Sequence, residues 1–179
     1  MELLDVYDDN GKKTGKVVER TCKDSDFAPG EHIAVAIIYI ENSKGEFLLQ
    51  KTSKQKGGRY SSTGGHLEHN EEPIDTIKRE VKEELGIDIT KDNIVDLGCL
   101  VFDFPVRFIY YLNKDVDLND IVLQKEEVES VSYMNINQIN DIIEKGLMHK
   151  AHAKILQKVL EYKKDNKSNA KILDTMKGD

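Results

Sequence analysis

The sequence of 179 residues contains no tryptophan, two cysteines and three prolines. Cys22 and Cys99 are too few for a disulfide framework, and they lack the CxxC spacing of a structural zinc site. The longest apolar run, Ile33 to Ile40, is far shorter than the roughly 20 residues that cross a bilayer. The first fifteen residues carry acidic groups and lack the apolar core of a signal peptide. These absences predict a cytoplasmic protein with reduced thiols and no membrane contact.

Positive charge is also scarce, because 26 Lys and Arg stand against 33 Asp and Glu, which gives a formal net charge of −7. A protein that binds nucleic-acid polymers needs a net cationic stripe to displace counterions, so the composition argues against such a partner. The length fits one domain at roughly 100–200 residues per domain. The chain shows no repeat and no linker before Tyr162. We therefore predict one domain over residues 1–165 and a polar tail over residues 166–179.

The hydrophobic pattern predicts an α+β chain. Two short apolar runs, residues 3–7 and 14–20, flank Asn10-Gly11, a pair that favours a β-hairpin because both residues tolerate positive φ. A helix is predicted to begin near Pro73 and to stop at Gly86. Further strands are predicted at residues 32–41, 47–51, 94–104, 106–112 and 128–134, and further helices at 137–146 and 150–164.

The segment from Gly65 to Ile87, GHLEHNEEPIDTIKREVKEELGI, carries the candidate chemistry. On the predicted helix, Glu80, Glu83 and Glu84 stand at i, i+3 and i+4 and share one edge beside the apolar stripe. Like charges at these spacings repel each other by a few tenths of a kcal/mol per pair. Clustered carboxylates suit the hard divalent cations Mg²⁺ or Mn²⁺. The alternative interpretation is a solvated acidic helix face.

This segment resembles the Nudix box, G-x5-E-x7-R-E-U-x-E-E-x-G-U, where U is apolar. The residues at the fixed positions of the box are Gly65, Glu71, Arg79, Glu80, Val81, Glu83, Glu84, Gly86 and Ile87. The resemblance implies the Nudix fold, a mixed β-sheet sandwiched between α-helices. It also implies a MutT-like pyrophosphatase, in which a metal-activated water cleaves a nucleoside diphosphate linked to another moiety.

The resemblance assigns the metal ligands. Glu80, Glu83 and Glu84 correspond to the box glutamates that hold the divalent cations, and the Gly65 carbonyl corresponds to the usual backbone ligand. Glu68 stands where many members of the family carry an extra glutamate close to the metals. The implied cofactor is Mg²⁺ or Mn²⁺.

The remaining box residues are implied to be structural. Arg79 corresponds to the arginine that orients the acidic helix by pairing with Glu71, and Gly86 ends that helix. Asn70 stands where relatives commonly have glycine. Because asparagine tolerates the left-handed conformation better than most residues, the loop is still expected to form.

The general base is left open by the box. Glu80 is one candidate. The loop Lys125-Glu126-Glu127-Val128 offers others, because similar acidic loops precede a strand in relatives. We prefer Glu127 to Glu126, and the alternative is that both are surface charges.

Substrate contacts are less specific. Lys56 and Arg59 belong to a local positive patch that could receive phosphates, and His66 adjoins the metal loop. Each could instead be a solvated side chain. The aromatic residues between Phe102 and Tyr111 could stack on a base, but at strand spacing they more often pack in a core.

Two other functions compete with the hydrolase. The N-terminal half resembles the branch of the superfamily that includes isopentenyl-diphosphate isomerase, whose catalytic cysteine precedes a Gly-His pair; here Gly64 precedes Gly65-His66. A non-catalytic nucleotide-binding module is the other alternative. The expected partner is a small diphosphate or nucleotide substrate. The oligomeric state stays open, a homodimer included, and the base, sugar and leaving group are not predicted.

Overall fold

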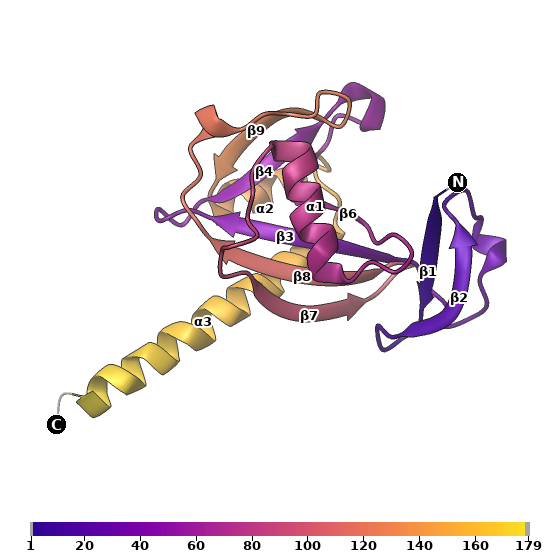
Figure 1. The fold of residues 1–179 in the computed structure, drawn as a ribbon. Helices are drawn as coiled ribbons and strands as arrows, with labels where there is room; N and C mark the ends of the chain where they lie inside the picture. Colours follow the sequence, from indigo (N-terminus) through magenta and orange to yellow (C-terminus); the bar gives the residue numbers. More distant parts are fainter. Residues whose placement is uncertain (1, 178–179) are drawn as a thin grey trace.

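A mixed sheet of seven strands forms the middle layer of the computed structural model, which describes residues 2–177 (Figure 1). Its strands are β3 (Ala34–Glu41), β4 (Phe47–Thr52), β5 (Tyr60–Ser61), β6 (Thr63–His66), β7 (Val95–Val101), β8 (Val106–Asn113) and β9 (Val128–Met134). The order is β5-β4-β3-β8-β7, with β6 paired to β3 and β9 paired to β4. Only β3 and β8 run parallel among these described pairs. The predicted α+β class and mixed sheet are confirmed.

Helices cover both faces of this sheet. Helix α1 (Pro73–Leu85) packs on one face, while α2 (Ile136–Glu144) and α3 (Ala151–Lys177) pack on the other (Figure 1). Strand β3 contributes side chains to the cores on both faces of the sheet, because successive side chains of a strand point to opposite faces. Ile38 joins the cluster that contains α1, and Tyr39 joins the cluster that contains α3. The result is the sandwich that the resemblance implies.

The N-terminal hairpin forms a separate two-stranded sheet beside the main one (Figure 1). Strands β1 (Leu3–Tyr7) and β2 (Lys13–Glu19) pair antiparallel, as predicted. Gly11 takes a positive φ of 75° in the turn between them. The hairpin joins the body of the protein through backbone hydrogen bonds between Tyr7 and His32 of 2.7 and 2.8 Å.

Helix α1 has the predicted limits. Pro73 occupies the first turn, where its missing N–H costs no helical hydrogen bond. Gly86 ends the helix with a φ of 69°, a left-handed conformation that favours glycine. Ile77, Val81 and Leu85 are fully buried on the inner side. The core-facing stripe therefore fixes which edge of α1 carries the glutamates.

Helix α3 is longer than predicted. The sequence pattern predicts its end near residue 164, whereas the helix continues to Lys177. The stretch from residue 151 to 177 contains neither glycine nor proline, so nothing in it interrupts a helix. Single-turn 3-10 helices also lie at Asp24–Asp26, Lys54–Lys56 and Leu118–Asp120. Within residues 2–177, no helix combines the length and the apolar character needed to cross a membrane.

Candidate active site

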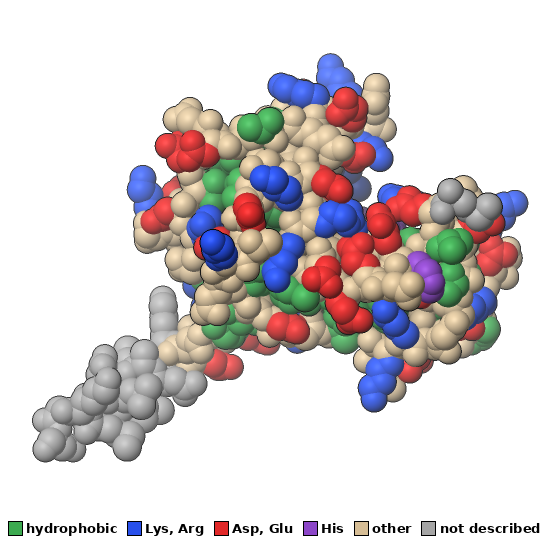
Figure 2. Space-filling view, viewed as in Figure 1, with side chains coloured by type: hydrophobic (Ala, Val, Ile, Leu, Met, Phe, Trp, Pro, Cys, Tyr) green, Lys and Arg blue, Asp and Glu red, His purple; other side chains and the backbone are tan. Residues whose placement is uncertain are grey.

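An acidic cleft of about 580 Å³ lies between α1, β6, the loop before β9 and the ends of the N-terminal hairpin. On the face drawn in Figure 2, acidic side chains gather between α1 and the hairpin. The charged residues that line the cleft are Glu2, Glu68, Glu80, Glu83, Glu84 and Glu127, with Arg20, Lys56 and Arg79. Six carboxyl groups against three cations leave an excess of negative charge, which attracts divalent cations.

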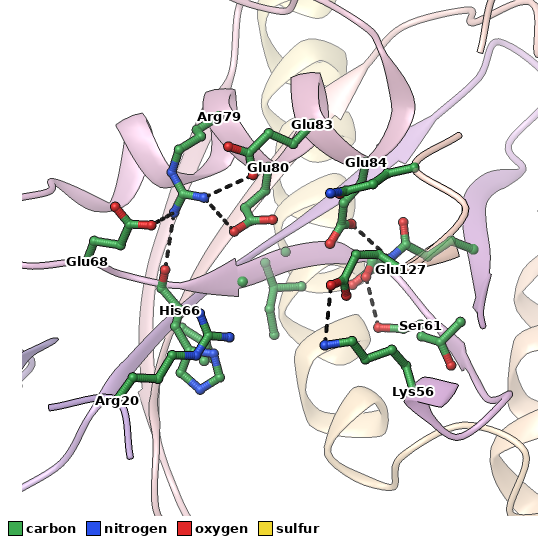
Figure 3. A pocket seen from close by; sticks show the side chains of 18 of the residues that line it. Arg20, Lys56, Ser61, His66, Glu68, Arg79, Glu80, Glu83, Glu84 and Glu127 are labelled. Atoms are coloured by element: carbon green, nitrogen blue, oxygen red, sulfur yellow. Dashed lines mark hydrogen bonds and ion pairs between the residues drawn. The ribbon is translucent and has the colours of Figure 1, made fainter. Parts of the chain in front are cut away.

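The three glutamates of α1 share one edge that faces this cleft (Figure 3). Glu83 is half exposed, with 51% of its side chain accessible, whereas Glu80 has 14%. Strand β6 approaches this edge closely at Gly65. A Cβ at residue 65 would lie 2.3 Å from Oε1 of Glu80, so a side chain there would displace the Glu80 carboxylate from this position. The strand backbone and the acidic edge thus meet at one place.

Glu84 is held by a strand residue that the sequence did not indicate. Nε2 of Gln50, on β4, donates a hydrogen bond of 2.9 Å to Oε2 of Glu84. Oγ1 of Thr63 donates in turn to Oε1 of Gln50 at 3.1 Å, which fixes the orientation of the amide. Burial raises the pKa of Glu84 to about 8, and the nearby charges of Glu80 and Glu127 act in the same direction. Without a further cation, this carboxyl group is poorly compensated.

Arg79 lies at the centre of the box. Its Nε and Nη2 atoms donate to Glu71, with the Nη2 to Oε1 distance at 3.0 Å. Its Nη1 atom donates to Glu80 at 2.8 Å and to Glu83 at 3.3 Å, and Nη2 also donates to the carbonyl of His66 at 3.3 Å (Figure 3). Burial raises the pKa of Glu80, while the charge of Arg79 offsets part of that rise. The arginine therefore connects the box loop, β6 and the acidic edge.

The acidic edge has the donor chemistry of a site for Mg²⁺ or Mn²⁺, because it offers carboxylate oxygens and the backbone of Gly65. Within the described part of the chain, residues 2–177, no three His, Cys, Asp or Glu groups converge on one point in a way that could hold an ion. Nη1 of Arg79 donates to a carboxylate oxygen of both Glu80 and Glu83.

Of the two glutamates in the loop before β9, Glu127 faces the cleft. Its Oε1 atom lies 3.3 Å from Nζ of Lys56. Ser53 fixes the backbone of this loop: its N–H donates to the Glu127 carbonyl, and its Oγ donates to the Glu126 carbonyl. Glu126 lines a small surface hollow with Lys54 instead. The geometry thus brings Glu127, and not Glu126, to the α1 glutamates.

Only some of the predicted substrate residues line the cleft. Lys56 and His66 line the cleft. Burial and the charge of Arg20 lower the pKa of His66, which favours its neutral form. Arg59 is not among the lining residues, and its Nη2 atom donates to the Gly146 carbonyl at 3.2 Å. The strand aromatics do not line the cleft either; Tyr110 and Tyr111, for example, are buried in the two cores.

The hairpin supplies two lining residues that sequence reasoning missed. Glu2 precedes β1 and Arg20 follows β2, and both reach the cleft. No local pattern indicated this, because their place depends on how the hairpin packs against the box loop.

The comparisons with known proteins identify a family and the fold. A family model described as NUDIX domain matches residues 30–159. An uncharacterized Nudix hydrolase of Listeria monocytogenes is 33% identical over 156 residues, which covers 82% of this chain and 87% of the relative. An isopentenyl-diphosphate Delta-isomerase of Corynebacterium diphtheriae is 30% identical over 113 residues, 61% of this chain and 59% of the relative. The crystal structure of a Deinococcus radiodurans protein covers 82% of this chain and 91% of its own, with a TM-score of 0.67 and 18% identity.

Proposed function

The chain belongs to the Nudix hydrolase family, whose members cleave phosphorus-containing anhydrides, and on this premise we propose that it is a Mg²⁺-dependent pyrophosphohydrolase. Its substrate is a nucleoside diphosphate linked to another moiety, and the reaction is cleavage of this substrate by water. One observation carries the proposal: Glu80, Glu83 and Glu84 line a single cleft together with Glu127. An isolated acidic helix face would not bring a fourth carboxylate from a distant loop to the same cavity.

In this proposal Glu80, Glu83, Glu84 and the Gly65 carbonyl hold Mg²⁺ or Mn²⁺, with Glu68 beside them. The bound metal supplies Lewis-acid chemistry, which neutralises the diphosphate and activates water. The raised pKa of Glu84 supports this assignment. A buried carboxyl group with too little countercharge gains one when a cation binds.

The chain's own residues position the reacting groups. Gln50 holds Glu84 in place through its 2.9 Å hydrogen bond. Arg79 fixes the box loop to α1 through Glu71. Glu127 is our preferred general base, because it is a carboxylate outside the box that still lines the cleft. Nζ of Lys56 lies 3.3 Å from the Oε1 atom of this carboxylate.

A nucleotide-type substrate fits the size of the cleft. Its volume of about 580 Å³ lies within the roughly 300–1,000 Å³ of small-molecule sites. A diphosphate also needs cations in a cleft of excess negative charge, and Lys56 and the bound metal provide them. The base, sugar and leaving group are not assigned. We propose that residues 1–165 form the catalytic domain.

Isomerase chemistry is the second candidate, and the similarity to the Corynebacterium diphtheriae enzyme favours it. The catalytic cysteine of such an isomerase would stand at residue 64 of this chain. A Cβ there would lie 2.3 Å from the backbone oxygen of Ala36, so β3 would have to move to accept any side chain. Neither Cys22 nor Cys99 lines the cleft. The proton donor of the isomerase therefore has no equivalent, and hydrolysis is the better-supported function.

A substrate screen tests the proposal. The full chain with Mg²⁺ is assayed on nucleoside di- and triphosphates, dinucleoside polyphosphates, nucleotide sugars and isopentenyl diphosphate. Phosphate-containing products from a nucleotide-type compound are expected. Double-bond migration in isopentenyl diphosphate would favour the isomerase, and saturable binding without turnover would favour a non-catalytic module.

Substitution of the ligands completes the test. We expect Glu83→Gln and Glu84→Gln each to lower kcat by about 100-fold or more, equivalent to about 2.7 kcal/mol of barrier. Glu144→Gln, on the exposed side of α2, is the matched control and should leave kcat unchanged. Near-wild-type turnover of either cleft variant at saturating Mg²⁺ would contradict the proposed metal site.

A further inference from the structure

The N-terminal hairpin is fastened to the loop that precedes α1. Asp5 on β1 is buried, with 7% of its surface exposed. Its Oδ2 atom accepts a 2.9 Å hydrogen bond from the backbone N–H of Asn70, and its Oδ1 atom lies 2.8 Å from Nδ1 of His69. The N–H of His69 also donates to the Leu3 carbonyl at 2.9 Å. The hairpin therefore holds a fixed position relative to the acidic edge of α1.

This attachment places the two ends of the hairpin at the cleft. The N–H of Arg20 donates to the Glu2 carbonyl at 3.0 Å, which continues the pairing of β1 with β2. Both side chains line the cleft, and Arg20 lies beside His66 (Figure 3). Nη1 of Arg20 donates to Oε1 and Oε2 of Glu2 at 2.8 and 2.9 Å. The hairpin thus contributes a cation and its carboxylate partner to the site.

The three cationic side chains of the cleft differ in how many of their donor atoms are already bonded to other residues. Arg79 spreads its donors over Glu71, Glu80, Glu83 and the His66 carbonyl. Lys56 contacts Glu127. Arg20 uses one nitrogen, Nη1, for both bonds to Glu2, so Nε and Nη2 are not engaged in that pair. With 48% of its side chain exposed, Arg20 can also turn toward an incoming ligand.

We propose that Arg20 binds a phosphate group of the substrate and that Glu2 occupies this position until the substrate enters. A guanidinium presents a planar fork of donors that matches a phosphate as well as a carboxylate. A diphosphate carries at least two negative charges, against one for the carboxylate that it displaces, so exchange of Glu2 favours substrates with a charged diphosphate. The hairpin thereby acts as a specificity element. This inference rests on the proposed hydrolase function.

Two substitutions with opposite expected effects test this role. Binding of methylenediphosphonate, a non-hydrolysable diphosphate, is measured by calorimetry with Mg²⁺ on the full chain. Arg20→Gln should raise Kd by about tenfold, the size of one charge-assisted contact. Glu2→Gln should lower Kd by about threefold or more, because it removes the competing carboxylate. Lys16→Gln is the matched control, since Lys16 lies on the same hairpin but pairs with Glu31.

The outcomes separate a ligand from a structural ion pair. If the pair only fastens the hairpin, Arg20→Gln and Glu2→Gln will weaken binding alike and lower the melting temperature alike. That result, an unchanged Kd for Arg20→Gln, or no binding by the wild type would overturn the role of Arg20. None of these results touches the proposed hydrolase, which the substrate screen tests separately.

Discussion

The guanidinium of Arg79 lies against the carboxylate of Glu80, with Nη1 2.8 Å from Oε1. The same guanidinium pairs with Glu71, whose side chain is 13% exposed. One arginine thus compensates two largely buried carboxylates on different segments, the box loop and α1. The box is therefore held together by electrostatics in addition to the apolar packing of α1.

Arg79→Ala should destabilise the metal-free protein. The substitution leaves Glu71 and Glu80 buried without their partner, which costs roughly 2–4 kcal/mol of unfolding free energy. Denaturant unfolding measures the loss. Lys145→Ala is the control, because its pair with Asp141 is exposed and screened by solvent, so it should contribute little to stability. If both variants lose the same stability, Arg79 is not the structural centre of the box.

Gln50→Leu should impair catalysis without removing any charge. The variant takes away the donor to Oε2 of Glu84, so the pKa of this carboxyl group should rise further. We expect kcat at neutral pH to fall by about tenfold or more, with the rising limb of its pH profile displaced to higher pH. Gln157→Leu, on the exposed side of α3, controls for the loss of an amide. An unchanged pH profile in Gln50→Leu would show that Glu84 does not depend on Gln50.

Stability of the metal-free protein should depend on the ionisation of Glu84. Burial raises the pKa of Glu84 from 4.5 to about 8 in the folded state. Between these values the folded chain keeps a proton that the unfolded chain releases, so the unfolding free energy falls as pH rises and levels off above about pH 8. Denaturant unfolding in a chelator at about pH 5 and about pH 8, with Glu84→Gln as reference, isolates this contribution. A pH-independent difference between the two proteins would contradict it.

Asn70 should tolerate glycine but not alanine. Its φ is 66°, in the left-handed region, where a residue with an ordinary side chain costs about 1 kcal/mol. Asn70→Gly should therefore retain the melting temperature, and Asn70→Ala should lower it. The backbone N–H that donates to Asp5 is present in both variants, so it does not bias the comparison. Equal melting temperatures for the two variants would contradict this explanation.

The local parts of the structure were predictable. Pro73 and Gly86 set the limits of α1 because they act through the backbone of one segment, and Asn70 adopts the expected left-handed conformation for the same reason. The hairpin followed from Asn10-Gly11. Strand β6 was missed because glycine is depleted in strands. Residue 64 needs glycine because the backbone of β3 approaches too closely for a side chain, and a side chain at residue 65 would displace the Glu80 carboxylate.

The missed site residues share a physical cause. Gln50, Glu2 and Arg20 are far from the box in sequence and reach the cleft only through the packing of β4 and the hairpin. A glutamine in a strand or an arginine after a hairpin carries no local signal of such contacts. Glu127 could be preferred over Glu126 only through resemblance, because the direction of each side chain depends on how Ser53 fixes the loop.

The central claim is that water attacks a phosphorus atom of the substrate in the acidic cleft beside α1. Turnover in ¹⁸O-labelled water with Mg²⁺, followed by mass spectrometry of the products, tests it most directly. The account predicts the label in one phosphate-containing product of the nucleotide-type substrate that turns over, with Cys22→Ser and Cys99→Ser equally active. Efficient isomerisation of isopentenyl diphosphate with every phosphate oxygen unlabelled, abolished by either cysteine substitution, would contradict it.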